Sequence, residues 1–178
     1  MPYPDVPAFV EELRAREGVA ALALEFGILT AARSAEILGA GWDEIDLAAR
    51  IWTVPPHRMK AGRAHRVPLS TRAMEILSQM EAIRNGEYVF PGLVQGRPLS
   101  VNSLKKVLRR SNVQGATVHG FRSSFRDWAG ECTTFPREVA EAALAHVVGD
   151  ETEIQRFCRF SRLQPFQNEL EHGNRLPS

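Results

Sequence analysis

The stretch VAALALEFGILTA at residues 19–31 constrains the fold more than any other part of the chain, because it is apolar almost all the way round a helix. A helix without a polar face must be enclosed by other elements, so the pattern predicts a central, buried helix. Glu25 interrupts the apolar run, which is also too short to cross a bilayer. With 178 residues, 44% of them hydrophobic, the chain is long enough for one domain to enclose such a helix.

Capping and helix-breaking residues predict that shorter helices surround this stretch. Serines stand before three of the segments, where a hydroxyl can accept a hydrogen bond from the first helical turn. Glycines follow several of the segments, and a helix commonly ends at such a residue. The helices predicted in this way cover about residues 5–16, 19–33, 34–39, 70–83 and 100–110, and others begin near His119, Pro136 and Asp150.

Three short runs have the composition of β-strands. IWTVP, at residues 51–55, follows the turn WDEIDLAAR. The runs RMK and HRVPL flank Ala61-Gly62-Arg63, which predicts a hairpin with a basic tip. The chain is therefore expected to be α+β: mostly α-helical, with one small antiparallel sheet.

Cysteine usage and the N-terminus indicate the compartment. Cys132 and Cys158 are 26 positions apart and belong to no CxxC motif, so we expect neither a disulfide framework nor a zinc site. The first residues include acids rather than the basic start of a signal peptide. We therefore expect a cytoplasmic protein that neither crosses nor binds a membrane.

Positive charge is concentrated in the middle of the chain, although the net charge of the whole chain is only +1. Residues 51–126 hold thirteen Lys/Arg against three Asp/Glu, a net charge of +10, whereas residues 1–50 carry −5 and residues 127–178 carry −4. Such a block favours binding to a polyanion such as nucleic acid. The alternative is an ordinary solvated face.

The segment TVHGFRSSFRDWAGE, at residues 117–131, places cationic side chains beside aromatic ones. On a helical wheel one narrow arc is predicted to face the core, and it consists of Phe121, Phe125 and Trp128. His119, Arg122 and Arg126 lie beside it, at the expected boundary of core and solvent, where packing can hold a guanidinium rigid with its donors outward. A rigid arginine can bind a phosphate through two parallel hydrogen bonds. For H-x-x-R alone, a snorkelling arginine and a structural histidine are the alternative.

Similar side chains recur at other junctions between predicted elements. Arg33 follows the central helix, Lys60 stands at the hairpin tip and His146 ends VAEAALAH. The segments around them read T-x-x-R-x-x-E-I-L-G with W-x-x-I-D, then M-K-x-G-x-x-H-R-V-P-L-S, H-G-F-R and L-A-H. In order and spacing, over residues 5–154, these boxes resemble the catalytic domain of the tyrosine recombinases, the integrases of phages and genomic islands.

The resemblance implies a reaction on double-stranded DNA with no metal and no small-molecule cofactor, and other integrase protomers as further partners. Arg33 and Arg122 would hold the non-bridging oxygens of the scissile phosphate, and His146 would be a further phosphate donor. His119 would handle a proton beside Arg122, and Lys60, on a mobile hairpin, would protonate the departing 5′ oxygen. Three acids lie close together in one turn, Asp43, Glu44 and Asp46. The resemblance implies that this turn is structural.

The family's nucleophile, a tyrosine that forms a covalent 3′-phosphotyrosine, is missing where the resemblance places it, about ten residues after His146. Gln155, Arg156 and Phe157 stand there. The thiol and hydroxyl alternatives are Cys158 and Ser161, and the spacing of the site disfavours both. The tyrosines of this chain match none of the boxes; they are Tyr3 and Tyr88.

These patterns divide the chain into an integrase-like catalytic domain at residues 1–154 and a divergent tail, frameshifted or disordered, at residues 155–178. The tail loses helical periodicity, which motivates the hypothesis of a frameshift or truncation near Ile154. The sequence favours a catalytic domain for site-specific recombination or integration that does not cleave DNA on its own. Two alternatives stay open: a non-catalytic DNA-binding module acting with or against a complete integrase, and an unrelated enzyme using His119 and His146 as acid and base.

Overall fold

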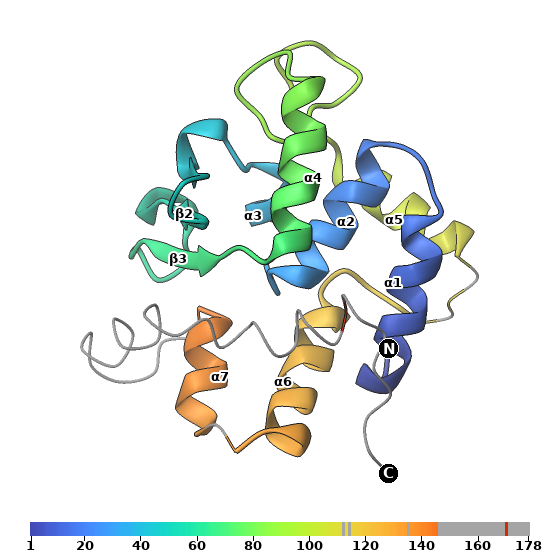
Figure 1. The fold of residues 1–178 in the computed structure, drawn as a ribbon, viewed down its shortest axis with the longest axis vertical. Helices are drawn as coiled ribbons and strands as arrows, with labels where there is room; N and C mark the ends of the chain where they lie inside the picture. The colour runs from blue at the N-terminus through green and yellow to red at the C-terminus, as the bar shows by residue number, and fades with distance from the viewer. Residues whose placement is uncertain (112, 114, 135, 146–169, 171–178) are drawn as a thin grey trace.

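The computed structural model describes residues 1–111, 113, 115–134, 136–145 and 170 (Figure 1). His146, the helix predicted near Asp150 and the tail at residues 155–178, apart from Leu170, lie outside the described residues. The described part contains α1 (Val6–Arg14), α2 (Val19–Leu29), α3 (Ser34–Leu38), α4 (Thr71–Ala82), α5 (Val101–Arg110), α6 (Gly120–Cys132) and α7 (Arg137–Ala143). Its 3₁₀ helices are η1 (Tyr3–Asp5), η2 (Trp42–Glu44) and η3 (Pro56–Arg58).

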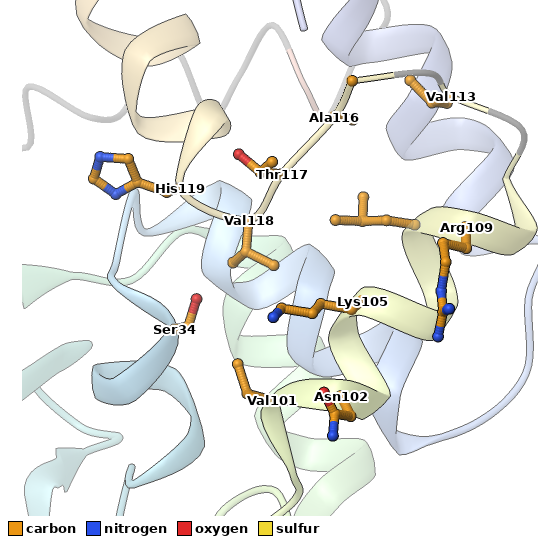
Figure 2. A pocket seen from close by; sticks show the side chains of 12 residues that line it. Ser34, Val101, Asn102, Lys105, Arg109, Val113, Ala116, Thr117, Val118 and His119 are labelled. Atoms are coloured by element: carbon orange, nitrogen blue, oxygen red, sulfur yellow. The ribbon is translucent and has the colours of Figure 1, made fainter.

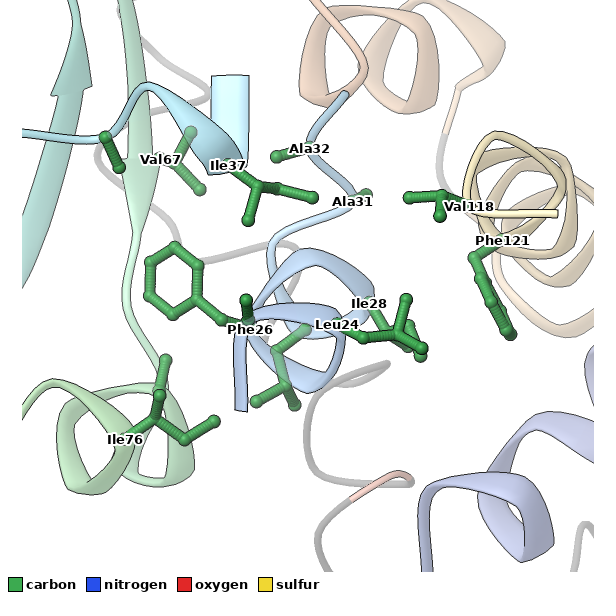
Figure 3. Close-up of a cluster of buried hydrophobic side chains, with 14 of the residues drawn as sticks. Leu24, Phe26, Ile28, Ala31, Ala32, Ile37, Val67, Ile76, Val118 and Phe121 are labelled. Atoms are coloured by element: carbon green, nitrogen blue, oxygen red, sulfur yellow. The ribbon is translucent and has the colours of Figure 1, made fainter. Parts of the chain in front are cut away.

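Helix α2 lies at the centre of the fold, as its all-round apolar sequence predicts. Every residue from Ala23 to Leu29 is buried, and α2 contacts α1, α3, α4 and α5. The Phe26 ring lies 5.4 Å from the rings of both Trp52 and Phe90, and Figure 3 shows it pointing from α2 toward Ile76 and Val67. The burial of these large side chains supplies the main favourable free energy of folding.

Glu25 is the one charged residue within this central helix, and it is only 1% exposed. Its carboxylate accepts from Arg14 Nε of α1 at 2.6 Å. It also accepts from Arg72 Nε and Nη2 of α4, both at 2.9 Å. A buried carboxylate must be paired to be tolerated, so this ion-pair network connects α1, α2 and α4 inside the core.

The sheet has three antiparallel strands in the order β1-β2-β3, namely β1 (Ile45–Asp46), β2 (Ile51–Val54) and β3 (His65–Pro68). Residue Val54 pairs with His65 at the loop end of the hairpin. The prediction of a strand at RMK is wrong, because Pro55 and Pro56 start η3, in which Met59 N–H donates to the Pro56 carbonyl. Proline favours this first helical turn and cannot donate to a strand ladder.

The helix boundaries agree closely with the capping signals. Ser70 Oγ accepts from Ala73 N–H at 3.1 Å, as predicted for a cap. Ser34 was predicted as a cap and is instead the first residue of α3. The Arg33 N–H donates to the Glu36 carboxylate at 2.8 Å, so the glutamate three residues into the helix satisfies this backbone donor.

The observed architecture is mostly helical with one small antiparallel sheet, which confirms the predicted fold class. Figure 1 shows α6 and α7 side by side, with the sheet beyond α3 and α4. Phe121 of α6 stacks on Phe9 of α1, with ring centroids 5.3 Å apart. Within the described residues, none of the helices has the length and apolarity that a membrane span requires.

Candidate active site

Arg33 and Arg122 are 89 positions apart in the sequence and meet at the end of α7. Arg33 Nη2 donates to the Leu144 carbonyl oxygen at 3.4 Å. Arg122 Nη2 donates to the same oxygen. The fold therefore brings together two of the five predicted site residues, next to the L-A-H segment that carries a third.

Arg122 connects the ends of two helices. Its Nη1 donates to the Ala31 carbonyl just after α2, while Nη2 donates to the Leu144 carbonyl just after α7. Both helix ends contain a residue in the left-handed region, Ala31 with φ 49° and Ala145 with φ 51°. The N–H groups of Ala31 and Ala32 bond back to Ile28 and Gly27, the Schellman pattern of a helix end. The Arg122 guanidinium thus lies at the negative ends of two helix dipoles.

This position is deeper than predicted from the helical wheel. Arg122 is only 4% exposed, whereas it was expected at the boundary of core and solvent with its donors outward. Arg126, which was expected beside Arg122 at the same boundary, is exposed, and its Nη2 lies 3.6 Å from Asp127 Oδ1. The core face itself was predicted correctly, since Phe121, Phe125 and Trp128 are all buried. Burial lowers the pKa of Arg122 to about 10, and the nearby charge of Arg33 adds to the shift.

Glu36 supplies negative charge directly bonded to this site, and Glu141 of α7 also acts on Arg122. Its carboxylate accepts from Arg33 Nη1 at 2.7 Å as well as from the Arg33 backbone N–H. Glu36 is 5% exposed, and its charge opposes the lowering of the pKa of Arg122. The carboxylate therefore fixes the Arg33 side chain and offsets part of the repulsion between the two guanidinium groups.

His65 of β3 is a site residue that the sequence reasoning missed. It hydrogen-bonds to the backbone of Ala143 in α7, and the charges of Arg33, Arg122 and Glu36 all act on its imidazole. Burial lowers the pKa of His65, Arg122 and Arg33 lower it further, and Glu36 and the Ala143 hydrogen bond oppose them. Alternation along β3 was the available signal, since His65 shares its strand face with buried Val67.

We expect the folded protein to lose stability below neutral pH, and to lose less of it in the His65→Gln variant. A histidine whose pKa is lowered by folding contributes stability that is present above its unfolded pKa and is lost as the pH falls through the folded pKa. Urea unfolding at about pH 7.5 and about pH 5.5 measures the difference, with the exposed His57→Gln as the matched control. An equal loss in all three proteins would contradict this role for His65.

The structure places the remaining predicted residues less closely with respect to the arginine pair. His119 is exposed and immediately precedes α6, and its carbonyl accepts from Arg122 N–H at 3.1 Å. Lys60 is exposed in the loop between η3 and β3. His146 follows Ala145 and lies outside the described residues.

Arg58 holds the base of the Lys60 loop against α3, the helix that directly follows Arg33. It donates to the Glu44 carboxylate, to the Glu36 carbonyl and, at 3.3 Å, to the Ala35 carbonyl. Glu44 also accepts from Trp52 Nε1 at 2.9 Å. The acidic turn therefore has a structural contact at Glu44. Among the described residues, no three His, Cys, Asp or Glu side chains are arranged to hold a metal ion.

Within the described residues, the side chains of Arg33 and Arg122 bond to Glu36, Ala31 and Leu144, and neither tyrosine of the chain takes part. Tyr3 donates to the Glu131 carboxylate at 2.9 Å in the last turn of α6, about 13 Å along the helix from Arg122. Its hydrogen bonds with Cys132 and Glu131 raise the pKa of Tyr3, which makes the phenolate harder to form. Tyr88 forms an isolated bridge with Gly41.

A cavity of about 940 Å³ lies beside His119, between α5, Ser34 and the segment that precedes α6. Figure 2 shows Lys105 extending from α5 across it, toward Val118 and Ser34. Arg109, one turn further along α5, also lines it. The cavity is thus lined by two cations of α5 and by the residues that neighbour the arginine pair in the sequence, Ser34 and His119.

Comparison with known proteins identifies the family. The phage integrase family profile matches residues 4–155. Prophage integrase IntA of Escherichia coli (strain K12) is 41% identical over 132 residues, 72% of this chain and 31% of the relative. Prophage integrase IntZ of the same strain is 38% identical over 151 residues, 83% of this chain and 37% of the relative. The chain therefore spans about a third of the length of these relatives.

The fold has a solved counterpart. The Tn1549 transposon integrase (residues 82–397), in complex with circular intermediate DNA, has a TM-score of 0.63 to this structure. The match covers 84% of this chain and 57% of that one at 13% identity, which shows a shared fold. A family match over most of the sequence, with relatives at 38–41% identity, establishes that the chain belongs to the phage integrase family of tyrosine recombinases.

Proposed function

We propose that this chain is the catalytic domain of a site-specific DNA recombinase and that Arg33 and Arg122 hold a phosphate of the bound strand. The observation that carries the proposal is their convergence on one carbonyl oxygen, that of Leu144. Two preorganised guanidinium groups at one point can offset the charge that develops on the non-bridging oxygens of a phosphate under attack.

The two arginines would take up the phosphate in sequence. Arg33 is the more accessible, with a side chain 30% exposed and a long 3.4 Å contact to Leu144, so it would meet the DNA first. Arg122 is buried, and its bonds to the Ala31 and Leu144 carbonyls use two of the five N–H donors of a guanidinium. Arg122 would therefore meet the phosphate after Arg33, with these two bonds holding it in place.

Protons would be handled by side chains around this pair. We assign Lys60 the protonation of the departing 5′ oxygen, because its loop is exposed and held at its base by Arg58 against α3. His119, one turn before Arg122, would exchange a proton beside it, and His146 would be a further phosphate donor. The proposed chemistry uses fixed cations and a general acid.

We further propose that this 178-residue chain does not form the covalent phosphotyrosine by itself. Tyr3 is bonded to Glu131 and Tyr88 bridges Gly41, so neither is placed to attack a phosphate at the arginine pair. A second integrase protomer would supply the tyrosine in trans. We place this activity in the cytoplasm, and we regard residues 155–178 as a divergent tail to a catalytic domain of residues 1–154.

Duplex DNA binding is the first test, and we expect its affinity to fall at least tenfold between about 50 and about 200 mM salt. The reason is the net charge of +10 on residues 51–126, which would release counterions from the phosphate backbone. The family fold also occurs in an integrase solved with circular intermediate DNA. Fluorescence anisotropy titrations of a labelled duplex at the two salt concentrations measure this change in affinity. Undetectable or salt-insensitive binding would contradict the proposal.

A nicked suicide substrate then tests the chemistry. This chain alone should give no covalent protein–DNA adduct, whereas mixing it with an intact integrase lacking its own arginine pair should restore cleavage. An adduct formed by this chain alone would overturn the assignment of its tyrosines. DNA binding without complementation would instead favour the second candidate, a non-catalytic module that occupies recombination sites, which the basic block supports.

A further inference from the structure

The cavity beside His119 has walls of two kinds. Three cationic or imidazole side chains line it, Lys105, Arg109 and His119, and the described lining residues include no Asp or Glu. The other walls are mainly apolar, with Val101, Leu108 and Val118 among them. A site that combines apolar walls with unopposed cations suits a ligand with both a flat apolar part and a phosphate.

Helix α5 presents only half of its positive charge to this cavity. Lys105 and Arg109 are one turn apart and both line it, while Lys106 and Arg110 are exposed and do not line it. The spacing i, i+4 places the first two on one face. The two pairs therefore carry the same charge on the same helix, but only Lys105 and Arg109 line the cavity.

The cavity lies near the arginine site, although neither Arg33 nor Arg122 is among its lining residues. His119 lines it and accepts from the Arg122 backbone N–H, and Ser34, another lining residue, directly follows Arg33. A strand with one phosphate at the arginine pair, as in the proposed function, would therefore pass the side of the fold that holds the cavity.

We propose that the cavity receives one unstacked nucleotide of the bound DNA, with its phosphate on Lys105 and Arg109 and its sugar and base against Val101, Leu108 and Val118. A volume of about 940 Å³ lies in the range of ligand sites and accommodates a single nucleotide. A base in a stacked, paired duplex cannot enter, so the nucleotide must leave the stack, which costs a few kcal/mol when the base is paired. This inference rests on the proposed function.

The test compares a fully paired duplex with the same duplex carrying one unpaired 2-aminopurine. The unpaired nucleotide avoids the cost of unpairing, so we expect the bulged duplex to bind about tenfold more tightly, with a change in 2-aminopurine emission. Equal affinities with unchanged emission would overturn the inference and leave the proposed function intact. Failure of both duplexes to bind would instead contradict the proposed function.

Two matched double variants distinguish binding in the cavity from the general effect of positive charge on DNA affinity. The double variants Lys105→Gln/Arg109→Gln and Lys106→Gln/Arg110→Gln have the same net charge, so both should weaken paired-duplex binding alike. Only the first should abolish the preference for the bulged duplex. Loss of the preference in both, or in neither, would overturn the inference.

A filling variant tests the apolar walls. Val101 is 42% exposed and lines the cavity, so Val101→Trp should fill it without disturbing the core and should remove the preference. Leu93→Trp, at a fully exposed position outside the lining, is the control and should keep it. Thermal unfolding checks that both variants fold. If an acidic, leucine-containing peptide binds wild type but not Lys105→Gln/Arg109→Gln, and the two duplexes bind equally, the cavity belongs to a protein partner and the proposal fails.

Discussion

Replacing Arg122 by methionine is expected to lower the free energy of unfolding by about 3 kcal/mol. The guanidinium donates to the carbonyls of Ala31 and Leu144, and its loss leaves both without this partner near a buried site. It also removes the positive charge next to Glu36, which is 5% exposed. Urea unfolding followed by circular dichroism measures the change. An equal dependence of the unfolding free energy on urea concentration in the variants confirms two-state behaviour.

Arg126→Met on the same helix is the matched control for this prediction. Arg126 is half-exposed beside Asp127, and its replacement should change the free energy of unfolding by at most about 0.5 kcal/mol. Arg122→Lys should fall between the two, because an ammonium keeps the charge but lacks the planar fork that reaches two carbonyls at once. If Arg122→Met were as stable as Arg126→Met, the connection between the two helix ends would have no energetic role.

This double role affects how an inactive Arg122 variant is interpreted. The same side chain that we propose for phosphate binding also joins the end of α2 to the end of α7. Loss of DNA binding in Arg122→Met would therefore combine lost contact with lost structure. Arg33 gives the cleaner functional test, because its side chain is 30% exposed and its shortest side-chain contact is to Glu36, three residues along the chain.

Elements set by local sequence signals could be predicted from the sequence. The central place of α2 follows from an apolar surface on all sides, and the start of α4 follows from a serine whose hydroxyl bonds to Ala73. The hairpin was placed with the wrong first strand, because the composition of RMK outweighed the effect of Pro55 and Pro56 on the backbone. Each of these elements is determined by residues within it or next to it in the sequence.

The depth of a side chain was harder to predict, since it depends on segments distant in sequence. A helical wheel placed Arg122 beside the core face correctly, but its burial arises from Ala31, 91 residues away, and Leu144, 22 residues away. The Arg33 and Arg122 pairing followed only from the family resemblance. His65 was missed because its partners come from α3, α6 and α7, which no local pattern brings together.

Replacing Glu25 by glutamine is expected to destabilise the fold by about 3 to 5 kcal/mol. The carboxylate is 1% exposed and accepts from Arg14 at 2.6 Å and from Arg72 at 2.9 Å. Glutamine has the same size but offers one neutral acceptor in place of two charged oxygens, so the two guanidinium groups would face each other with the exposed Glu75, on Arg72, as the remaining counter-ion shown. Arg14 Nη2 is already buried without a partner in the described structure, so no spare acceptor is at hand there.

Glu75→Gln provides the comparison, because Glu75 binds the same Arg72 at the same 2.9 Å but its side chain is 54% exposed. An exposed pair is screened by water, so its loss should cost at most about 0.5 kcal/mol. Urea unfolding of the two variants therefore compares a buried carboxylate that binds two arginines with an exposed one that binds a single nitrogen of the same Arg72 at the same distance. If both variants lost the same small amount, the Glu25 network would be no stronger than a surface ion pair. A large loss only in Glu25→Gln would show that α2, and thus the Ala31 carbonyl that follows it and accepts from Arg122, depends on a charge buried between α1 and α4.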